Sequence, residues 1–147
     1  MINSYYDARN EIFTQYNLAK VEILALLGYQ PIVVYQGIES SAVMPTDKIW
    51  MRLSHQTVIE EQSTLAGNDL KRRYTSDGLI YVQIFIPKLT GVYTNGVKIA
   101  EYVKKAFRGK QTSSCMWFRN VRIQELAPEE AWFRLNVVSE YQYDQIG

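Results

Sequence analysis

The chain has 147 residues and a formal net charge of +1, with 47% hydrophobic and 21% charged residues, which is the composition of one ordinary globular domain. Its apolar runs are far shorter than the roughly 20 residues that cross a bilayer, so we expect no transmembrane helix, and the polar N-terminus predicts no secretory leader. The single cysteine, Cys115, excludes an intrachain disulfide and fits a reducing compartment.

A long amphipathic helix is predicted near residues 5–27. Ser4 followed three residues later by Asp7 resembles a capping box that opens the helix, and Gly28 with Pro31 ends it. Between these signals, apolar residues recur at spacings of three and four, which predicts one buried stripe: Tyr5, Ala8, Ile12, Tyr16, Ala19, Ile23 and Leu26. We expect this stripe to cover one face of a sheet.

A short strand and a long hairpin are predicted next. Residues 32–35 form an apolar strand, and residues 36–47 contain the glycine, serines and proline that are typical of an exposed loop. Residues 48–65 and 71–86 should form an antiparallel hairpin across a turn at residues 66–69. Within the returning limb, Ser76-Asp77-Gly78 indicates either a second turn or a bulge.

The returning limb is the predicted centre of the sheet. Ile80, Val82, Ile84 and Ile86 alternate with Leu79, Tyr81 and Phe85, so both sides of residues 79–86 are largely apolar. A strand that is apolar on both sides is typical of a central position, and Pro87 ends it because proline cannot donate to an interior ladder. We therefore expect other parts of the molecule to cover both faces of the sheet.

The second half of the chain predicts a helix and another hairpin. Thr94 or Asn95 is the expected N-cap of a helix near residues 95–108, which Gly109 ends. Residues 116–126 and 131–143 then form a hairpin. The element order is α-β-β-β-α-β-β, which predicts a single α+β domain over residues 1–147 with two helices packed on an antiparallel-rich, mixed sheet.

The sequence contains no recognisable catalytic or metal-binding pattern. His55 is the only histidine, which excludes a histidine pair for a metal, and on a strand we expect it to be a hydrogen-bonded or surface residue. Cys115 would need a base to act as a nucleophile, and His55 is the only imidazole that could serve. There is no phosphate-binding glycine motif. We therefore expect no catalytic residue, no cofactor and no metal site, and conclude that the protein is not an enzyme.

Charge is unevenly distributed along the chain. Residues 98–122 carry a net charge of +6, whereas residues 1–70 and 123–147 carry −4 each. Such bipolarity suits a protein that meets copies of itself through unlike surfaces, although pairing within one molecule would explain it equally well. A rival interpretation is a small nucleic-acid-binding module whose basic residues contact phosphates: Arg72, Arg73, Lys104, Lys105 and Arg108.

Several strings of the sequence together resemble a known kind of phage protein. They are HQTVIEEQSTLAG, RRYTSDGLIYVQIFIP, AFRGK, WFRNVRIQEL and WFRLNVVSEYQYD. They resemble a small family of phage structural proteins that is similar to the tail terminator, or tail-completion, proteins of long-tailed phages. The resemblance implies a virion protein, assembled in the bacterial cytoplasm, that forms a ring on the end of the tail tube, typically a hexamer. Its partners would be the major tail tube protein and the head-tail connector protein.

The resemblance also implies that DNA only passes through the ring as cargo, and that the protein has no catalytic residue. A neighbouring head-tail connector component is an alternative with the same composition. Two polar segments, residues 36–47 and 63–73, are the expected subunit or tube contacts. Because aromatic and arginine side chains dominate interface hot spots, the candidate interface residues near these segments are Trp50, Arg52, Arg72 and Arg73.

Overall fold

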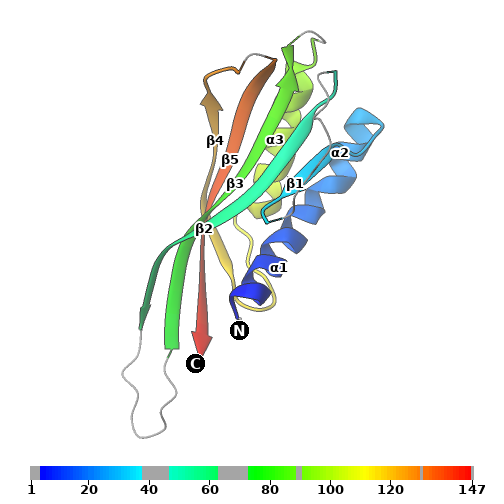
Figure 1. Cartoon of the computed structure of the whole chain (residues 1–147). Helices are drawn as coiled ribbons and strands as arrows, with labels where there is room; N and C mark the ends of the chain where they lie inside the picture. Colours follow the sequence, from blue (N-terminus) through cyan, green and yellow to red (C-terminus); the bar gives the residue numbers. More distant parts are fainter. Residues whose placement is uncertain (1–3, 38–46, 63–72, 89–90, 130, 147) are drawn as a thin grey trace, which may run out of the picture.

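A strongly twisted sheet of five strands carries a layer of helices on one face (Figure 1). The computed structural model describes residues 4–37, 47–62, 73–88, 91–129 and 131–146. The helical elements are α1 (Tyr5–Tyr16), the 3-10 turn η1 (Asn17–Ala19), α2 (Lys20–Leu27) and α3 (Tyr93–Phe107). The strands are β1 (Ile32–Tyr35), β2 (Trp50–Gln62), β3 (Arg73–Pro87), β4 (Trp117–Leu126) and β5 (Trp132–Ile146).

The sheet has the strand order β1-β2-β3-β5-β4, so β3 is central, as its composition predicts. Three of the four strand pairs are antiparallel, and β1 runs parallel to β2. The predicted fold class and element order are therefore confirmed. β3 ends at Pro87, which pairs with Trp132 as the last residue of its ladder.

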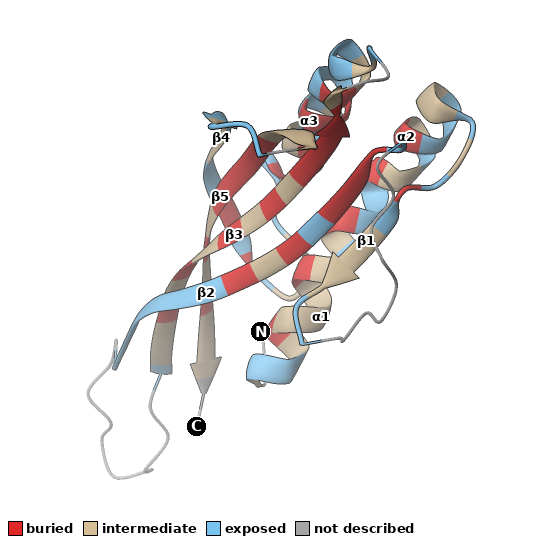
Figure 2. Cartoon of the chain, turned by 45° about the horizontal axis from the view of Figure 1, so that its top comes forward, coloured by how far each residue is buried: buried red, intermediate tan, exposed pale blue. Residues whose placement is uncertain are grey.

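The core lies between the helices and one face of the sheet (Figure 2). Ile80, Val82 and Ile84 of β3 point into it and are at most 1% exposed. From the helix side they meet a layer that includes Ile12, Ile23 and residues of α3. Each fully buried aliphatic side chain contributes roughly 1.5–3 kcal/mol, so this layer dominates the stability of the fold.

The first predicted helix exists, but η1 divides it into α1 and α2. Ser4 caps α1, because its Oγ accepts a hydrogen bond from the backbone N–H of Asp7 at 3.1 Å. Gly28 ends α2 with a left-handed φ of 78°. The predicted stripe is buried from Ala8 to Ile23, whereas Tyr5 is 52% exposed.

The second helix begins earlier than predicted, and its predicted cap is wrong. Val92 is at the N-cap position and makes no side-chain capping bond, while Thr94 and Asn95 lie inside the first turn. Gly96 faces the core, where a Cβ atom would overlap the side chain of Ile86. The apolar residues of this helix recur at spacings that predict one buried face, and the structure buries all five of them: Ile99, Ala100, Val103, Ala106 and Phe107.

β3 passes through Gly78 without a turn. The irregularity lies in the partner strand instead, where the register of β2 shifts between Thr57 and Ile59. A Cβ atom on Gly78 would overlap the carbonyl oxygen of Gln56 and the ring of Tyr141. Gly78 therefore allows the Tyr141 ring to lie directly over the central strand.

The expectation that both faces of the sheet are covered is wrong for the described part of the chain. The helices lie on one face only, and the other face, called here the open face, is uncovered in Figure 1. Phe85 on the open face is nevertheless 2% exposed, because the rings of Trp50 and Trp132 pack against it. Aromatic stacking between neighbouring strands, rather than a second layer, buries the apolar residue that the sequence places there.

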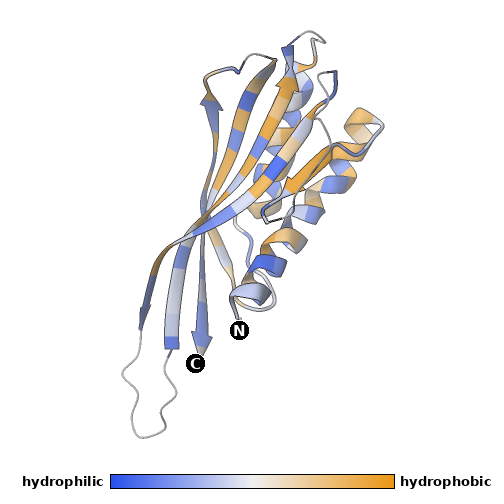
Figure 3. Ribbon diagram, in the orientation of Figure 1, coloured by the Kyte–Doolittle hydropathy of each residue, from blue (hydrophilic) through white to orange (hydrophobic). Residues whose placement is uncertain are grey.

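Three strands continue beyond the end of β1 and form an arm: residues 56–62 of β2, 73–79 of β3 and 140–146 of β5. β1 pairs with β2 only as far as Leu53. In Figure 1 the arm extends to the lower left, away from α2, and Figure 3 shows that its strand ends are mostly hydrophilic.

Candidate interaction surfaces

The three predicted interface residues that the structure describes, Trp50, Arg52 and Arg73, do not form one site. Trp50 pairs with Phe85 near one end of β3, whereas Arg73 is the first residue of β3. Twelve residue-to-residue steps of about 3.3 Å each separate Arg73 from Phe85, which places these two residues about 40 Å apart along the strand. Arg72 lies outside the described residues, as do residues 63–71 and most of the predicted loop 36–47.

Trp50 and Arg52 are brought together at the upper end of the open face. The Trp50 ring stacks on Phe85 at 3.9 Å between centroids, with an interplanar angle of 3°. The Arg52 guanidinium lies over both rings, 5.6 Å and 5.4 Å from their centroids, and its Nη1 donates to Oε1 of Gln83 at 3.4 Å. Trp50 is only 4% exposed, so it supports this surface, and Arg52 is the group that a partner can reach.

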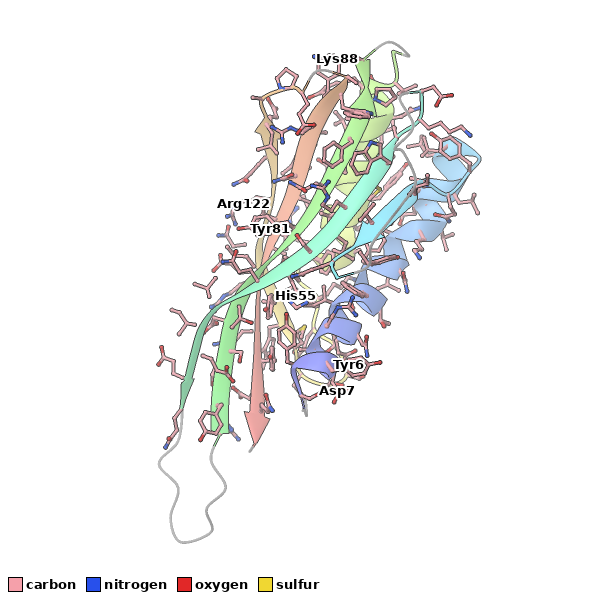
Figure 4. All side chains as sticks on the ribbon, viewed as in Figure 1. Tyr6, Asp7, His55, Tyr81, Lys88 and Arg122 are labelled. Atoms are coloured by element: carbon pink, nitrogen blue, oxygen red, sulfur yellow. The ribbon has the colours of Figure 1, made fainter. Side chains whose placement is uncertain are left out.

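A polar depression of about 490 Å³ lies beside Arg52 on the open face. Side chains of three adjacent strands line it, including Tyr81, Gln83 and Asn136. Tyr81 of β3 and Arg122 of β4, both labelled in Figure 4, are each paired with Val138 of β5 and therefore lie on either side of it. Sequence reasoning missed this surface, because the polar residues are far apart in the chain and only the strand register joins them.

The arm carries exposed apolar residues next to acidic ones. Val58 and Ile59, at the register shift of β2, are 56% and 49% exposed, and Glu60 and Glu61 follow them. Among the described residues of the arm, five are acidic and one, Arg73, is basic. Of the predicted contact at the hairpin tip, residues 63–73, only Arg73 lies among the described residues, so this contact stays a prediction.

The outer surface of α2 is apolar as well as its inner surface. Six of the eight residues of α2 are apolar, and Ile23 points into the core at 0% exposure. On the opposite side, Leu18 of η1 is 59% exposed, and Val21 and Leu24 of α2 are 75% and 44% exposed. Lys20 and Glu22 are the only charged residues of α2, and a group of exposed apolar side chains on the outer face has the composition of an interface.

Basic side chains gather beside that apolar face. A depression of about 450 Å³ is lined by Lys104, Lys105, Arg108 and Lys110 together with Glu22, Glu101 and Tyr102. Lys105 Nζ lies 3.4 Å from Oε1 of Glu22, which joins the end of α3 to α2. Of the five residues in the nucleic-acid interpretation, three therefore lie together here, while Arg73 lies on the arm.

His55 is buried, so the expectation of a hydrogen-bonded or surface histidine is wrong. It is 3% exposed and lies between β2 and α1 (Figure 4), where its ring is 5.3 Å from the centroid of Tyr5, 6.4 Å from Phe13 and 6.2 Å from Tyr141. Neither ring nitrogen has a hydrogen-bond partner among the described residues. Burial lowers the pKa of His55 below its usual value, and the positive charge of Arg9 lowers it further.

This burial predicts a pH-dependent stability. Below about pH 6.5 the unfolded chain takes up a proton at His55 that the folded protein resists, so the free energy of unfolding falls as the pH decreases, by at most about 1.4 kcal/mol per pH unit. His55→Phe removes the titrating group and suits the aromatic surroundings. Urea denaturation between pH 7.5 and 5.5 should show a smaller loss of stability for the variant. The same loss in both proteins would show that His55 does not cause it.

The described residues contain no group of three or more histidine, cysteine or acidic side chains that is placed to hold a metal ion. Cys115 is exposed in a left-handed conformation with φ of 64°, after α3, whereas His55 is enclosed under α1. Within the same described ranges, no helix has the length and apolar character needed to cross a membrane.

Comparisons with known proteins support the fold and nothing further. No family model and no curated protein sequence matches the chain. Among solved structures, the chain is similar to one whose name states no function, with a TM-score of 0.59 and 14% identity. The match covers 86% of this chain and 87% of the other. At this identity the likeness shows that the two proteins share a fold over most of their lengths.

Proposed function

We propose that this protein is a tail terminator, or tail-completion protein, of a long-tailed phage. It forms a closed ring on the last layer of the tail tube, stops tube growth and presents a surface to the head connector. The sequence resemblance described above suggests this role. The observation that carries it is the presence of two unlike exposed surfaces, the acidic arm and the apolar outer face of α2 beside basic residues. A ring of identical subunits needs such a pair of different surfaces.

The open face is the proposed surface for the tube or the connector protein. Arg52 presents its guanidinium there, next to a depression lined by polar side chains. Arginine over an aromatic support, surrounded by hydrogen-bonding groups, is a composition common in interface centres. In this proposal DNA only passes through the ring, and no residue acts as a catalyst. A neighbouring connector component would use the same surfaces at a different level of the particle.

Localisation in purified particles tests the proposal. A copy of the protein with a C-terminal affinity tag, expressed during infection, should be found by gold labelling at the head-proximal end of every tail. A tag fused to the major tail protein is the matched control and should label the whole tail. Labelling at the distal tip, along the tube or only inside heads would contradict the proposed function.

The nucleic-acid interpretation is kept as a second candidate, because Lys104, Lys105, Arg108 and Lys110 line one depression. A module that binds through phosphates should bind double-stranded DNA tightly at low salt and lose affinity steeply as salt rises. Binding that is steeply salt-dependent, and that Lys104→Glu with Lys105→Glu abolishes, would favour this candidate. No binding at low salt would exclude it.

A further inference from the structure

We propose that the arm of one subunit binds the outer face of α2 and the adjoining end of α3 of the next subunit, and that this contact builds the ring. The acceptor surface, called the helix patch, consists of Leu18, Val21 and Leu24 with Lys105 and Lys110. The inference rests on the proposed function and specifies which surfaces meet in the ring.

The arm has the properties of a docking element. Beyond Leu53, the outer edge of β2 has no strand partner in the part of the chain that the structure describes. Proteins usually protect such an edge with charges or bulges, and β2 has both, yet Val58 and Ile59 are about half exposed at the bulge itself. Two apolar side chains held outward on a long projecting edge suggest that a partner covers them.

The helix patch offers a complementary apolar surface. Leu18 lines a depression of about 170 Å³ together with Tyr102, Lys105 and Lys110, and Val21 lies one helical turn further along. Val21 is 75% exposed, the largest exposed fraction of any large apolar side chain in the described residues. Exposed phosphate groups would not cover such residues, so the apolar part of the patch favours a protein partner over a nucleic acid.

Charge selects the arm as the occupant. Glu60 and Glu61 follow the apolar pair on the arm, and both are exposed. Lys105 and Lys110 flank the apolar residues of the patch, and Lys104 and Arg108 line the adjoining depression. Acidic side chains outnumber basic ones on the arm, whereas the four basic side chains at the patch outnumber Glu22 and Glu101, so the two surfaces have opposite net charges. Such complementarity aligns two surfaces and disfavours contact between two arms or two patches.

The placement of the two surfaces fits a ring rather than a two-fold dimer. Figure 1 shows the arm at the lower left and α2 at the upper right, so one subunit can donate its arm while it accepts the arm of another. A contact between two different patches repeats from copy to copy and closes when the rotation allows.

Cysteine cross-linking tests the contact directly. In a Cys115→Ser background, Ile59→Cys marks the arm and Val21→Cys marks the patch, and a short bismaleimide is added to concentrated protein and to purified tails. The protein with both cysteines should give a ladder of covalent oligomers. A mixture of the two single variants should give only dimers, and each single variant alone should give none. Ile59→Cys with Gln124→Cys, on the exposed edge strand β4, is the matched control and should give no ladder.

Three results would overturn the inference. One is self-linking of Ile59→Cys alone, which indicates a two-fold contact between arms. Another is a result that assigns the patch to another partner. Such a result is a cross-link from Val21→Cys to a protein of different mass in tails, or loss of the cross-link between Ile59→Cys and Val21→Cys when double-stranded DNA is added. The third is the absence of links in both samples. If electron micrographs show rings of the wild-type protein but the cross-linking samples give no links, the contact is wrong and the proposed function stands. If links form but the tagged protein is absent from tails, the proposed function is wrong and the contact stands.

Discussion

Replacing Ile84 with alanine is expected to lower the free energy of unfolding by about 2–5 kcal/mol. Ile84 is 0% exposed on the central strand β3, between Met51 of β2 and Leu135 of β5, which are themselves buried. The surrounding strands are fixed by their ladders and cannot close the cavity that the shorter side chain leaves. For a chain of this size the melting temperature should fall by about 5–15 °C.

Ile32→Ala is the matched control, because Ile32 is also on a strand but is 47% exposed. Its loss should cost about 1 kcal/mol or less. Denaturant unfolding of both variants measures the two values under the same conditions. Equal destabilisation would contradict the assignment of the core to the helix-covered face of the sheet.

Reversing the charges of the helix patch should weaken ring formation, and reversing those of the arm as well should restore it. Lys105→Glu with Lys110→Glu places acidic groups opposite Glu60 and Glu61, so repulsion replaces attraction and self-association should weaken at least tenfold, or about 1.4 kcal/mol. Adding Glu60→Lys and Glu61→Lys re-creates opposite signs with the partners exchanged. Sedimentation of concentrated protein measures the association.

Lys88→Glu with Lys98→Glu is the control for net charge. It makes the same change in total charge on residues outside the patch, at the end of β3 and in the first half of α3. This variant should associate as the wild type does. If it weakens association equally, or if the fourfold variant is not restored, the charges act through the whole molecule rather than through one contact.

The fold could be predicted from the sequence because its elements have strong periodicity. The double apolar pattern of residues 79–86 predicts a central strand, and the stripe from Ile99 to Phe107 predicts a buried helix face. Helix starts were less predictable, since Val92 occupies an N-cap position without capping α3. The capping residues alone do not indicate that α3 begins at Tyr93. In the structure, Gly96 in the first turn of α3 packs closely against Ile86.

The candidate surfaces were less predictable for two physical reasons. Trp50 and Arg73 are near two polar segments in the sequence, but the extended length of β3 carries them to opposite ends of the sheet. The environment of His55 comes from residues that only the tertiary fold brings together. The exposed face of α2 did leave a signal in the sequence, because its apolar residues exceed what one stripe requires. The apolar residues on both faces of this helix, and not only those of the buried stripe, indicate Val21 in the sequence.

Tail length in particles made without this protein tests the proposed role most directly. A phage from which the gene is deleted should produce tails of uncontrolled length that remain separate from filled heads, because nothing ends the growth of the tube. Expression of the wild-type protein from a plasmid should restore one narrow length distribution in electron micrographs. Tails of normal length joined to filled heads in the deletion phage would contradict the account.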